Sequence, residues 1–128
     1  MKRMTFIAGL CLVIAASATV FGADKTRIAV ASDGNTLASA VSQIAARSPY
    51  FLIFAGKGAF VGALSNPHKN AGGGAGNLVV DFLAGKGVTT IIAGAFGDKM
   101  ITAMKAKGIN YIEFKGIAVD AVKKAVKK

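Results

Sequence analysis

The residue types best suited to binding chemistry are concentrated in one stretch, residues 65–77, which reads SNPHKNAGGGAGN. It contains the only histidine of the chain, His68, together with four glycines and three asparagines. Glycines leave space for a ligand to approach the backbone, and the free N–H groups of a helix start attract anionic or metal-oxo groups. The alternative is a connector that only turns the chain between two elements. A local function is expected here.

Several enzyme classes lack the residues that they require. Divalent-metal nucleases need clustered carboxylates, but the acidic residues are few and scattered: Asp24, Asp33, Asp81, Asp98, Glu113 and Asp120. No serine lies in a nucleophile-elbow motif, and one histidine without a nearby second base makes a poor triad. The glycines match neither a Walker loop nor the spacing of a dinucleotide fingerprint. We therefore predict that the protein is not an enzyme.

The imidazole of His68 has two interpretations. It is either a structural or exposed histidine, or a ligand to a metal. One imidazole with nearby amide donors and Lys69 would hold a bare Zn²⁺ poorly. The same groups could hold a preformed anionic cluster, because such a cluster brings most of its own ligands.

The first residues have the pattern of a signal peptide. Lys2 and Arg3 precede an apolar run over residues 6–16, which small residues follow. Cleavage after Gly22 or after Ala18 fits the small-residue rule, and we prefer Gly22 because strand-like sequence begins soon afterwards. The prediction is a signal peptide at 1–22, a single domain at 23–128, and export to the periplasm or another extracytoplasmic space. The alternative is an uncleaved N-terminal anchor.

Cleavage would change the composition in two ways. It removes Cys11, the only cysteine, so disulfides and thiolate ligands are excluded from the mature chain. Removing Lys2 and Arg3 lowers the net charge from +10 to 10 − 2 = +8. Because no arginine cluster or aromatic-basic stripe is present, we expect no nucleic acid partner, and no membrane association after signal removal. Basic surfaces permit an acidic protein partner, and four lysines lie near the C-terminus: Lys123, Lys124, Lys127 and Lys128.

Hydrophobic periodicity predicts alternating elements after an initial hairpin. Strands are expected at 26–31, 50–54, 59–64, 88–93 and 109–114, with residues 56–58 closing the hairpin. Residues 37–46 are predicted to be a loop with one helical turn. The first helix is expected at 77–84, with Leu78, Val79, Phe82 and Leu83 inside. A second helix would bury Met100, Ile101 and Met104, and a third would place Val119, Val122 and Val126 on one face.

This element order predicts an α/β fold with a five-stranded mixed sheet in the order 3-2-1-4-5 and three main helices. A hairpin followed by strand–helix alternation with right-handed crossovers resembles the ribonuclease H-like motif. In that layout the ends of strands 1, 3, 4 and 5 open on one edge, where open α/β sheets bind their ligands. Residues 32–35, 66–74, 94–97 and 115–116 would converge there, together with Arg47.

The sequence resembles the dinitrogenase iron-molybdenum cofactor biosynthesis domain family, the NifX/NafY type also found at the end of the NifB protein. The resemblance lies in IAVASDG, RSPYFLIF, NPHKNAGGGAGN, VTTIIAGAFGDKM and KGINYIEFKG, in this order. It implies a ribonuclease H-like sheet without nuclease chemistry, and a role in binding or carrying the iron-molybdenum cofactor or its iron-sulfur precursors. Carried over by position, it points to Arg47, Asn66, residues 73–76, Gly94 and Gly97.

We therefore predict a carrier of an iron-molybdenum or iron-sulfur cluster, or of a related small anionic ligand. The alternative is a structural or interaction module that contacts acidic partners and holds no cofactor. The predicted ligand-binding residues are Asp33, Arg47, Asn66, Lys69, Gly73, Gly74, Gly76, Gly94 and Gly97, and His68 is the predicted metal ligand. Arg47 and Lys69 would supply charge, and His68 is the one side chain suited to a borderline metal.

The signal peptide has a direct test. The intact mass of the native protein should correspond to a chain that begins at Ala23, or at Thr19 if the second cleavage position is used. A native chain that still begins at Met1 or Lys2 would contradict export with cleavage.

Overall fold

A computed structural model describes residues 26–126, so the predicted signal peptide lies outside the described residues. The elements are β1 (Arg27–Ser32), the 3₁₀ helix η2 (Ala45–Arg47), β2 (Tyr50–Ala55), β3 (Phe60–Ser65), α2 (Ala75–Gly85), β4 (Thr90–Ala93), α3 (Asp98–Lys107), β5 (Asn110–Glu113) and α4 (Ala118–Val126). The predicted helical turn within residues 37–46 corresponds to η2, which ends one residue later. Within residues 26–126, no helix is long and apolar enough to cross a membrane.

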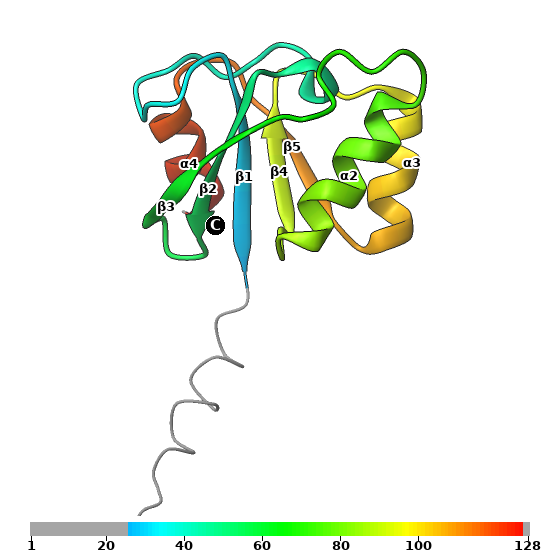
Figure 1. Cartoon of the computed structure of the whole chain (residues 1–128). Helices are drawn as coiled ribbons and strands as arrows, with labels where there is room; N and C mark the ends of the chain where they lie inside the picture. The colour runs from blue at the N-terminus through cyan, green and yellow to red at the C-terminus, as the bar shows by residue number, and fades with distance from the viewer. Residues whose placement is uncertain (1–25, 127–128) are drawn as a thin grey trace, which may run out of the picture.

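The sheet has five strands in the order β3-β2-β1-β4-β5, as predicted. β2 runs antiparallel to β1 and β3, whereas β1, β4 and β5 run parallel to one another. The hairpin turn at residues 56–58 joins β2 and β3 as an antiparallel pair, and the crossover through α3 joins β4 and β5 as a parallel pair. The carboxyl ends of β1, β3, β4 and β5 therefore reach the same edge of the sheet, at the top of Figure 1.

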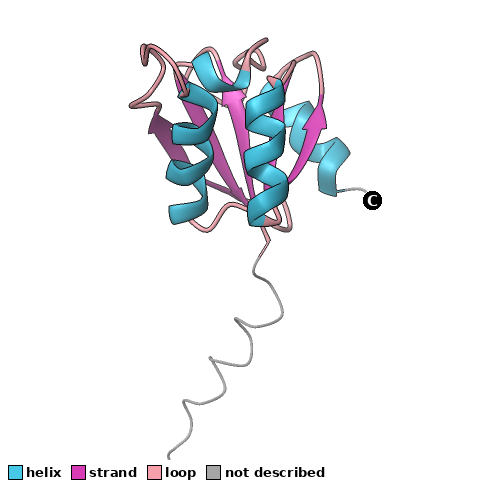
Figure 2. Cartoon of the chain, turned by 90° about the vertical axis from the view of Figure 1, so that its right-hand side faces the viewer, coloured by secondary structure: helices cyan, strands magenta, loops and turns pink. Residues whose placement is uncertain are grey.

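Helices cover both faces of the sheet, giving three layers (Figures 1 and 2). Side chains alternate between the two faces along each strand. Phe51 and Ile91 pack with α2 and α3 in one core cluster, whereas Leu52 and Ile92 pack with α4 in the other. One face thus carries two helices and the other carries α4 alone.

The buried face of α2 differs from the prediction at Leu78 and Val80. Leu78, expected inside, is 40% exposed, whereas Val80 is fully buried beside the predicted Val79 and Leu83. The reason is the contact of α2 with α3. A Cβ atom at Gly76 would lie 2.9 Å from the Cβ of Met100, so only glycine permits this approach. The glycine edge of α2 is turned toward α3, and Leu78 is turned toward solvent.

The helix also begins earlier than predicted, at Ala75 rather than at residue 77. Gly74 precedes it with a left-handed φ of 74°, a conformation that glycine adopts at little cost. This extension places the first turn of α2 inside the glycine-rich stretch. The backbone N–H groups of that turn therefore become part of the sheet edge.

The Gly76 contact predicts opposite results for alanine at two positions of the same helix. Gly76→Ala should destabilise the fold by about 1–3 kcal/mol through overpacking against Met100. Gly85→Ala is the matched control, because a Cβ atom there meets nothing within 4 Å. It should leave stability unchanged or raise it by up to about 1 kcal/mol, the helix propensity difference. Chemical denaturation measures both, and equal stabilities would contradict the proposed close packing.

Candidate functional site

The glycine-rich loop after β3 is anchored by Asn66, whose side chain is buried. Its Nδ2 donates hydrogen bonds to the carbonyl oxygens of Ala46, at 3.1 Å, and Ser48, at 2.9 Å. Its Oδ1 accepts a 2.9 Å hydrogen bond from the backbone N–H of His68. The amide group thus ties the loop to the segment around η2. The sequence predicts a ligand contact for Asn66, whereas these bonds occupy its amide within the protein.

Arg47 also bonds to the backbone of the glycine-rich loop. Its Nη1 donates to the carbonyl oxygens of Lys69 and Ala71, and its Nη2 donates to the carbonyl of Gly72 at 3.2 Å. These bonds use three of the five guanidinium donors, so two remain, on Nε and Nη2. Arg47 therefore shapes the glycine-rich loop and still presents positive charge and free donors at the edge of the sheet.

The first turns of α2 and α3 line a common cleft with a volume of about 330 Å³. Gly74, Ala75 and Gly76 line it from the start of α2, and residues 97–100 line it from the start of α3. Arg47 and its neighbours Ile44 and Ala46 form the remaining wall. Neither helix start has a side-chain cap, so its first N–H groups have no such partner. Two helix N-termini therefore open into one cleft.

The charges of this cleft favour an anion. Two helix starts contribute partial positive charge, and Arg47 and Lys99 add two full positive charges. Asp98 is the one acidic residue in the lining, in the first turn of α3. Added Cβ atoms at Gly74 and Gly97 would meet nothing within 4 Å, so both positions face open space. A ligand with several negatively charged outer atoms could approach the backbone here.

The donor set does not fit a bare metal ion. Among residues 26–126, no group of three or more histidine, cysteine or acidic side chains could hold one. A cluster or oxoanion that brings its own sulfide or oxide ligands needs only hydrogen-bond donors and positive charge. The cleft supplies both. The residues therefore fit a preformed anionic group better than a bare metal ion.

One predicted site residue, Gly94, lines another hollow, and a second, Asp33, is bonded to the segment that borders this hollow. The N–H of Gly94 donates to the carbonyl of Ser42 at 2.8 Å, and a Cβ atom there would lie 2.9 Å from the Cα of Gln43. Gly94 lines a cavity of about 480 Å³ with Lys115 and Gly116. Asp33 accepts a hydrogen bond from Ser42, which also brings it to the 40–43 segment. Residues 40–43 border this second hollow, whereas residues 44–47 border the cleft.

His68 lies outside the lining of the cleft. Its imidazole packs edge-on against Phe82 of α2, with ring centroids 6.1 Å apart and an interplanar angle of 82°. Lys69 and Gly73 belong to the loop but do not line the cleft either. Of the predicted residues, the structure therefore brings together Arg47, Gly74, Gly76 and Gly97. Metal ligation by His68 stays a prediction.

Sequence reasoning missed Lys99 and Ile44, which both line the cleft. The position of Lys99 could have been predicted, because a lysine two residues after Gly97 must lie in the first turn of the predicted second helix. Ile44 is 54% exposed and belongs to a segment predicted as a loop. Its position depends on a bridge to Ala95, which connects residues that are far apart in sequence. Such pairings are not visible in a local pattern.

Comparisons with known proteins agree with this architecture. A family model described as dinitrogenase iron-molybdenum cofactor matches residues 26–128. The NMR structure of a NifB-like protein from Thermotoga is 33% identical, with a TM-score of 0.67, over 80% of this chain and 87% of that one. The apo form of the orange protein from Desulfovibrio gigas is 24% identical, with a TM-score of 0.74, over 80% and 88% of the two chains, and shows the shared fold. The curated proteins contain no significant match.

The hydrogen bonds of Arg47 predict that it orders the glycine-rich loop. Arg47→Ala and Arg47→Lys should both speed amide hydrogen exchange at Ala71 about fivefold. Each variant loses the planar guanidinium group, whose hydrogen bonds should stabilise the loop by about 1 kcal/mol. Lys99→Ala is the control, since it removes positive charge from the same cleft without a bond to the loop. Exchange measured by NMR that is equally fast in Lys99→Ala, or unchanged in Arg47→Ala, would contradict this role.

Proposed function

The chain belongs to the dinitrogenase iron-molybdenum cofactor family, and from this premise we propose that it is a non-enzymatic carrier of an anionic metal cluster. The cargo would be of the iron-molybdenum or iron-sulfur type, or a related metal-sulfide or metal-oxo anion. Membership of the family implies involvement with binding or biosynthesis of the iron-molybdenum cofactor. One observation carries the proposal: two uncapped helix N-termini share one cleft with Arg47 and Lys99.

The chemistry of the cleft supports carriage rather than catalysis. Its donors are backbone N–H groups and cationic side chains, which bind an anion without forming or breaking covalent bonds. Its one carboxylate, Asp98, has no second acidic group or imidazole beside it in the lining. A cargo held by hydrogen bonds and charge can be released intact when a partner offers stronger ligands. Reversible binding of this kind is what a carrier needs.

We place this carrier outside the cytoplasm, on the strength of the N-terminal pattern described above. A mature chain without cysteine suits that location, because it has no thiol that oxidation could modify. It also means that any cluster must arrive with its own sulfide or oxide ligands. The absence of thiolate donors therefore supports the same conclusion as the donor set of the cleft.

Binding of tetrathiomolybdate, an anion that carries molybdenum and sulfide, tests the site. Gly97→Val should weaken binding about tenfold or more, because its side chain fills the open space beside both helix starts. The backbone at Gly97, with φ −73° and ψ 157°, accepts valine without strain. Lys99→Glu should weaken binding by a similar factor, because it reverses a charge in the lining. Isothermal titration calorimetry measures each affinity.

Gly72→Val is the matched control for Gly97→Val. An added Cβ atom at Gly72 also meets nothing within 4 Å, yet Gly72 does not line the cleft. The affinity of Gly72→Val for tetrathiomolybdate should stay within about twofold of the native value. Thermal unfolding should show that all variants are folded. His68→Ala tests metal ligation separately. If Gly97→Val and Lys99→Glu bind like the native protein, the proposed cleft is not the binding site.

A further inference from the structure

The second candidate surface lies on the opposite face of the sheet, where α4 packs alone. The predicted valine face of α4 is only partly buried. Ala118, Ala121 and Val122 face the sheet, whereas Val126 is 40% exposed and Val119 is half-buried. Two of the three buried residues of α4 are alanines, and the helix keeps part of its valine face exposed. The described residues leave those valines uncovered.

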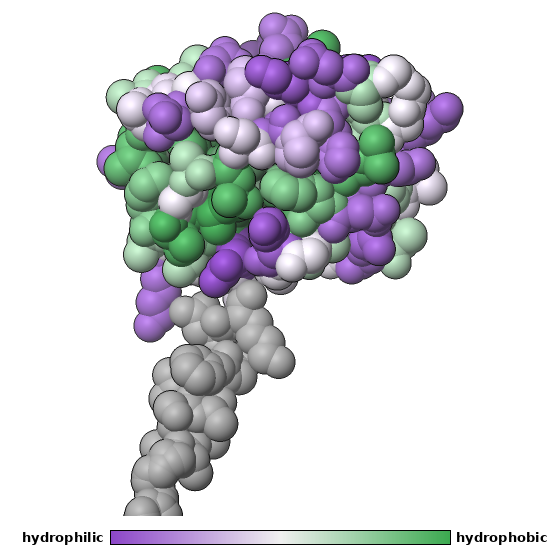
Figure 3. All heavy atoms as spheres, in the orientation of Figure 1, coloured by the Kyte–Doolittle hydropathy of each residue, from purple (hydrophilic) through white to green (hydrophobic). Residues whose placement is uncertain are grey.

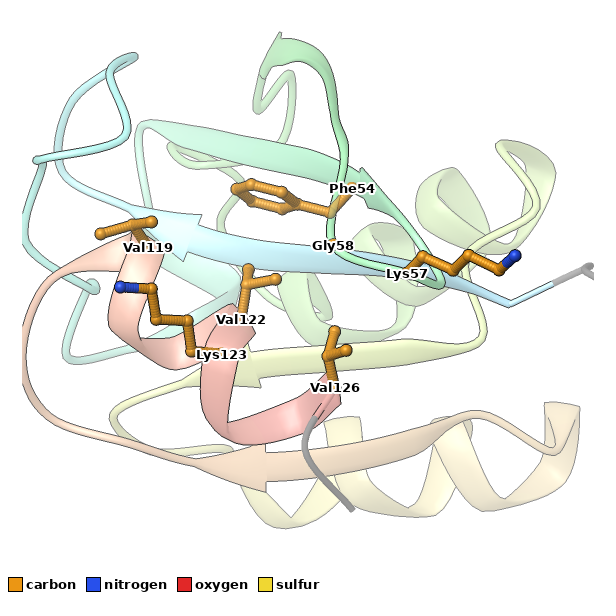
Figure 4. Close-up of a pocket in the computed structure, with 7 residues that line it drawn as sticks. All are labelled: Phe54, Lys57, Gly58, Val119, Val122, Lys123 and Val126. Atoms are coloured by element: carbon orange, nitrogen blue, oxygen red, sulfur yellow. The ribbon is translucent and has the colours of Figure 1, made fainter.

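These valines border a groove between α4 and the β2–β3 hairpin, shown in Figure 4. The groove has a volume of about 410 Å³, and its floor consists of Phe54 and the α4 valines Val119, Val122 and Val126. Gly58 of the hairpin turn approaches α4 closely, since a Cβ atom there would lie 3.7 Å from a methyl group of Val126. The floor is therefore apolar along its whole length.

Two lysines complete the groove. Lys57 extends from the hairpin turn, and Lys123 extends from α4, and their ammonium groups lie at opposite ends of the groove in Figure 4. No acidic residue belongs to the lining. Within residues 26–126, the one ion pair is between Lys107 and Asp81, so neither groove lysine has an acidic partner in the described part of the chain. An apolar floor with a free cation at each end selects an amphipathic anion.

The apolar character continues onto the hairpin. The ring of Phe60 in β3 packs on Phe54, with centroids 5.4 Å apart, and remains 45% exposed. β3 carries no charged residue. Figure 3 shows apolar residues gathered over this part of the molecule. The edge of the groove formed by the hairpin therefore offers further apolar contact to a bound segment.

We infer that this groove docks an acidic amphipathic segment of a partner protein, with its apolar side chains on the valines and its carboxylates at Lys57 and Lys123. Charge complementarity and shape favour an acidic peptide over a second copy of the chain or a membrane surface. A second copy of this chain, with a net charge of +10, or 10 − 2 = +8 after removal of the predicted signal peptide, would bring like charge to a basic groove. A flat bilayer would meet Lys124 as readily as Lys123 and would not enter a concave groove. An extended or helical peptide enters such a groove and reaches both lysines.

The groove shares no residue with the cleft at the starts of α2 and α3. The two surfaces lie on opposite faces of the sheet, α4 being on one and α2 and α3 on the other. A docked partner would therefore leave the cleft open. Docking at the groove therefore does not require the carrier function of the cleft.

The test is an NMR titration of the full chain with a synthetic peptide that carries leucines and a phenylalanine between two pairs of glutamates. We expect saturable shifts of the amides of Gly58, Val119 and Val126, and little change at Gly74 and Gly97. Lys123→Glu should weaken binding about tenfold. Lys124→Glu is the matched control, because it makes the same charge change on the adjacent residue of the helix outside the groove lining. It should weaken binding less than about threefold.

Val126→Asp tests the apolar floor at an exposed position, so its loss of binding does not require unfolding. It should abolish the shifts while thermal unfolding stays close to that of the native protein. Equal losses in Lys123→Glu and Lys124→Glu, or equal binding of a peptide with glutamines in place of glutamates, would overturn the inference. Binding to phosphatidylglycerol vesicles in a sedimentation assay would also overturn the inference if both lysine variants lose it equally. A dimer of the native chain that Val126→Asp dissociates would overturn it too. Absence of saturable peptide binding would overturn it as well.

Discussion

The close contact of Gly76 with Met100 determines the geometry on which the candidate site depends. A side chain at position 76 would overlap both the Cβ and the backbone of Met100, at 2.9 and 3.2 Å. Without that contact, α2 and α3 would have to pack farther apart, and their first turns could not line one cleft. Because the free N–H groups of a helix start act only at short range, their convergence depends on this spacing.

Some polar groups around the cleft bond within the protein, and others remain available to a ligand. The amide of Asn66 ties the glycine-rich loop to the segment around η2, and three Arg47 donors, two on Nη1 and one on Nη2, hold the backbone of the loop. What remains for a ligand is the helix starts, the free donors of Arg47, and Lys99. A site built from backbone donors tolerates ligands of different composition, provided that they are anionic and fit the space. This explains how a cleft whose lining contains no cysteine could hold an anionic cluster.

The sequence predicted the strand order correctly because a hairpin followed by strand–helix alternation allows few topologies. It failed where a distant contact decides the outcome. Leu78 fits the helical period as well as Val80 does, and only the approach of Met100 to Gly76 turns Leu78 outward. Similarly, Val126 continues the valine face of α4, yet it stays 40% exposed where it borders the groove. For the site, spacing predicted that Arg47 and the glycines would meet, but not that Gly94 would pack beneath the 42–43 backbone.

The central claim is that an anionic cluster binds to the N–H groups at the starts of α2 and α3 together. The most direct measurement is an NMR titration of the ¹⁵N-labelled protein with tetrathiomolybdate. We predict that the amides of Ala75, Gly76, Asp98 and Lys99 shift with one common affinity. Shifts confined to His68 and its neighbours, or to the hollow beside Gly94, would contradict it.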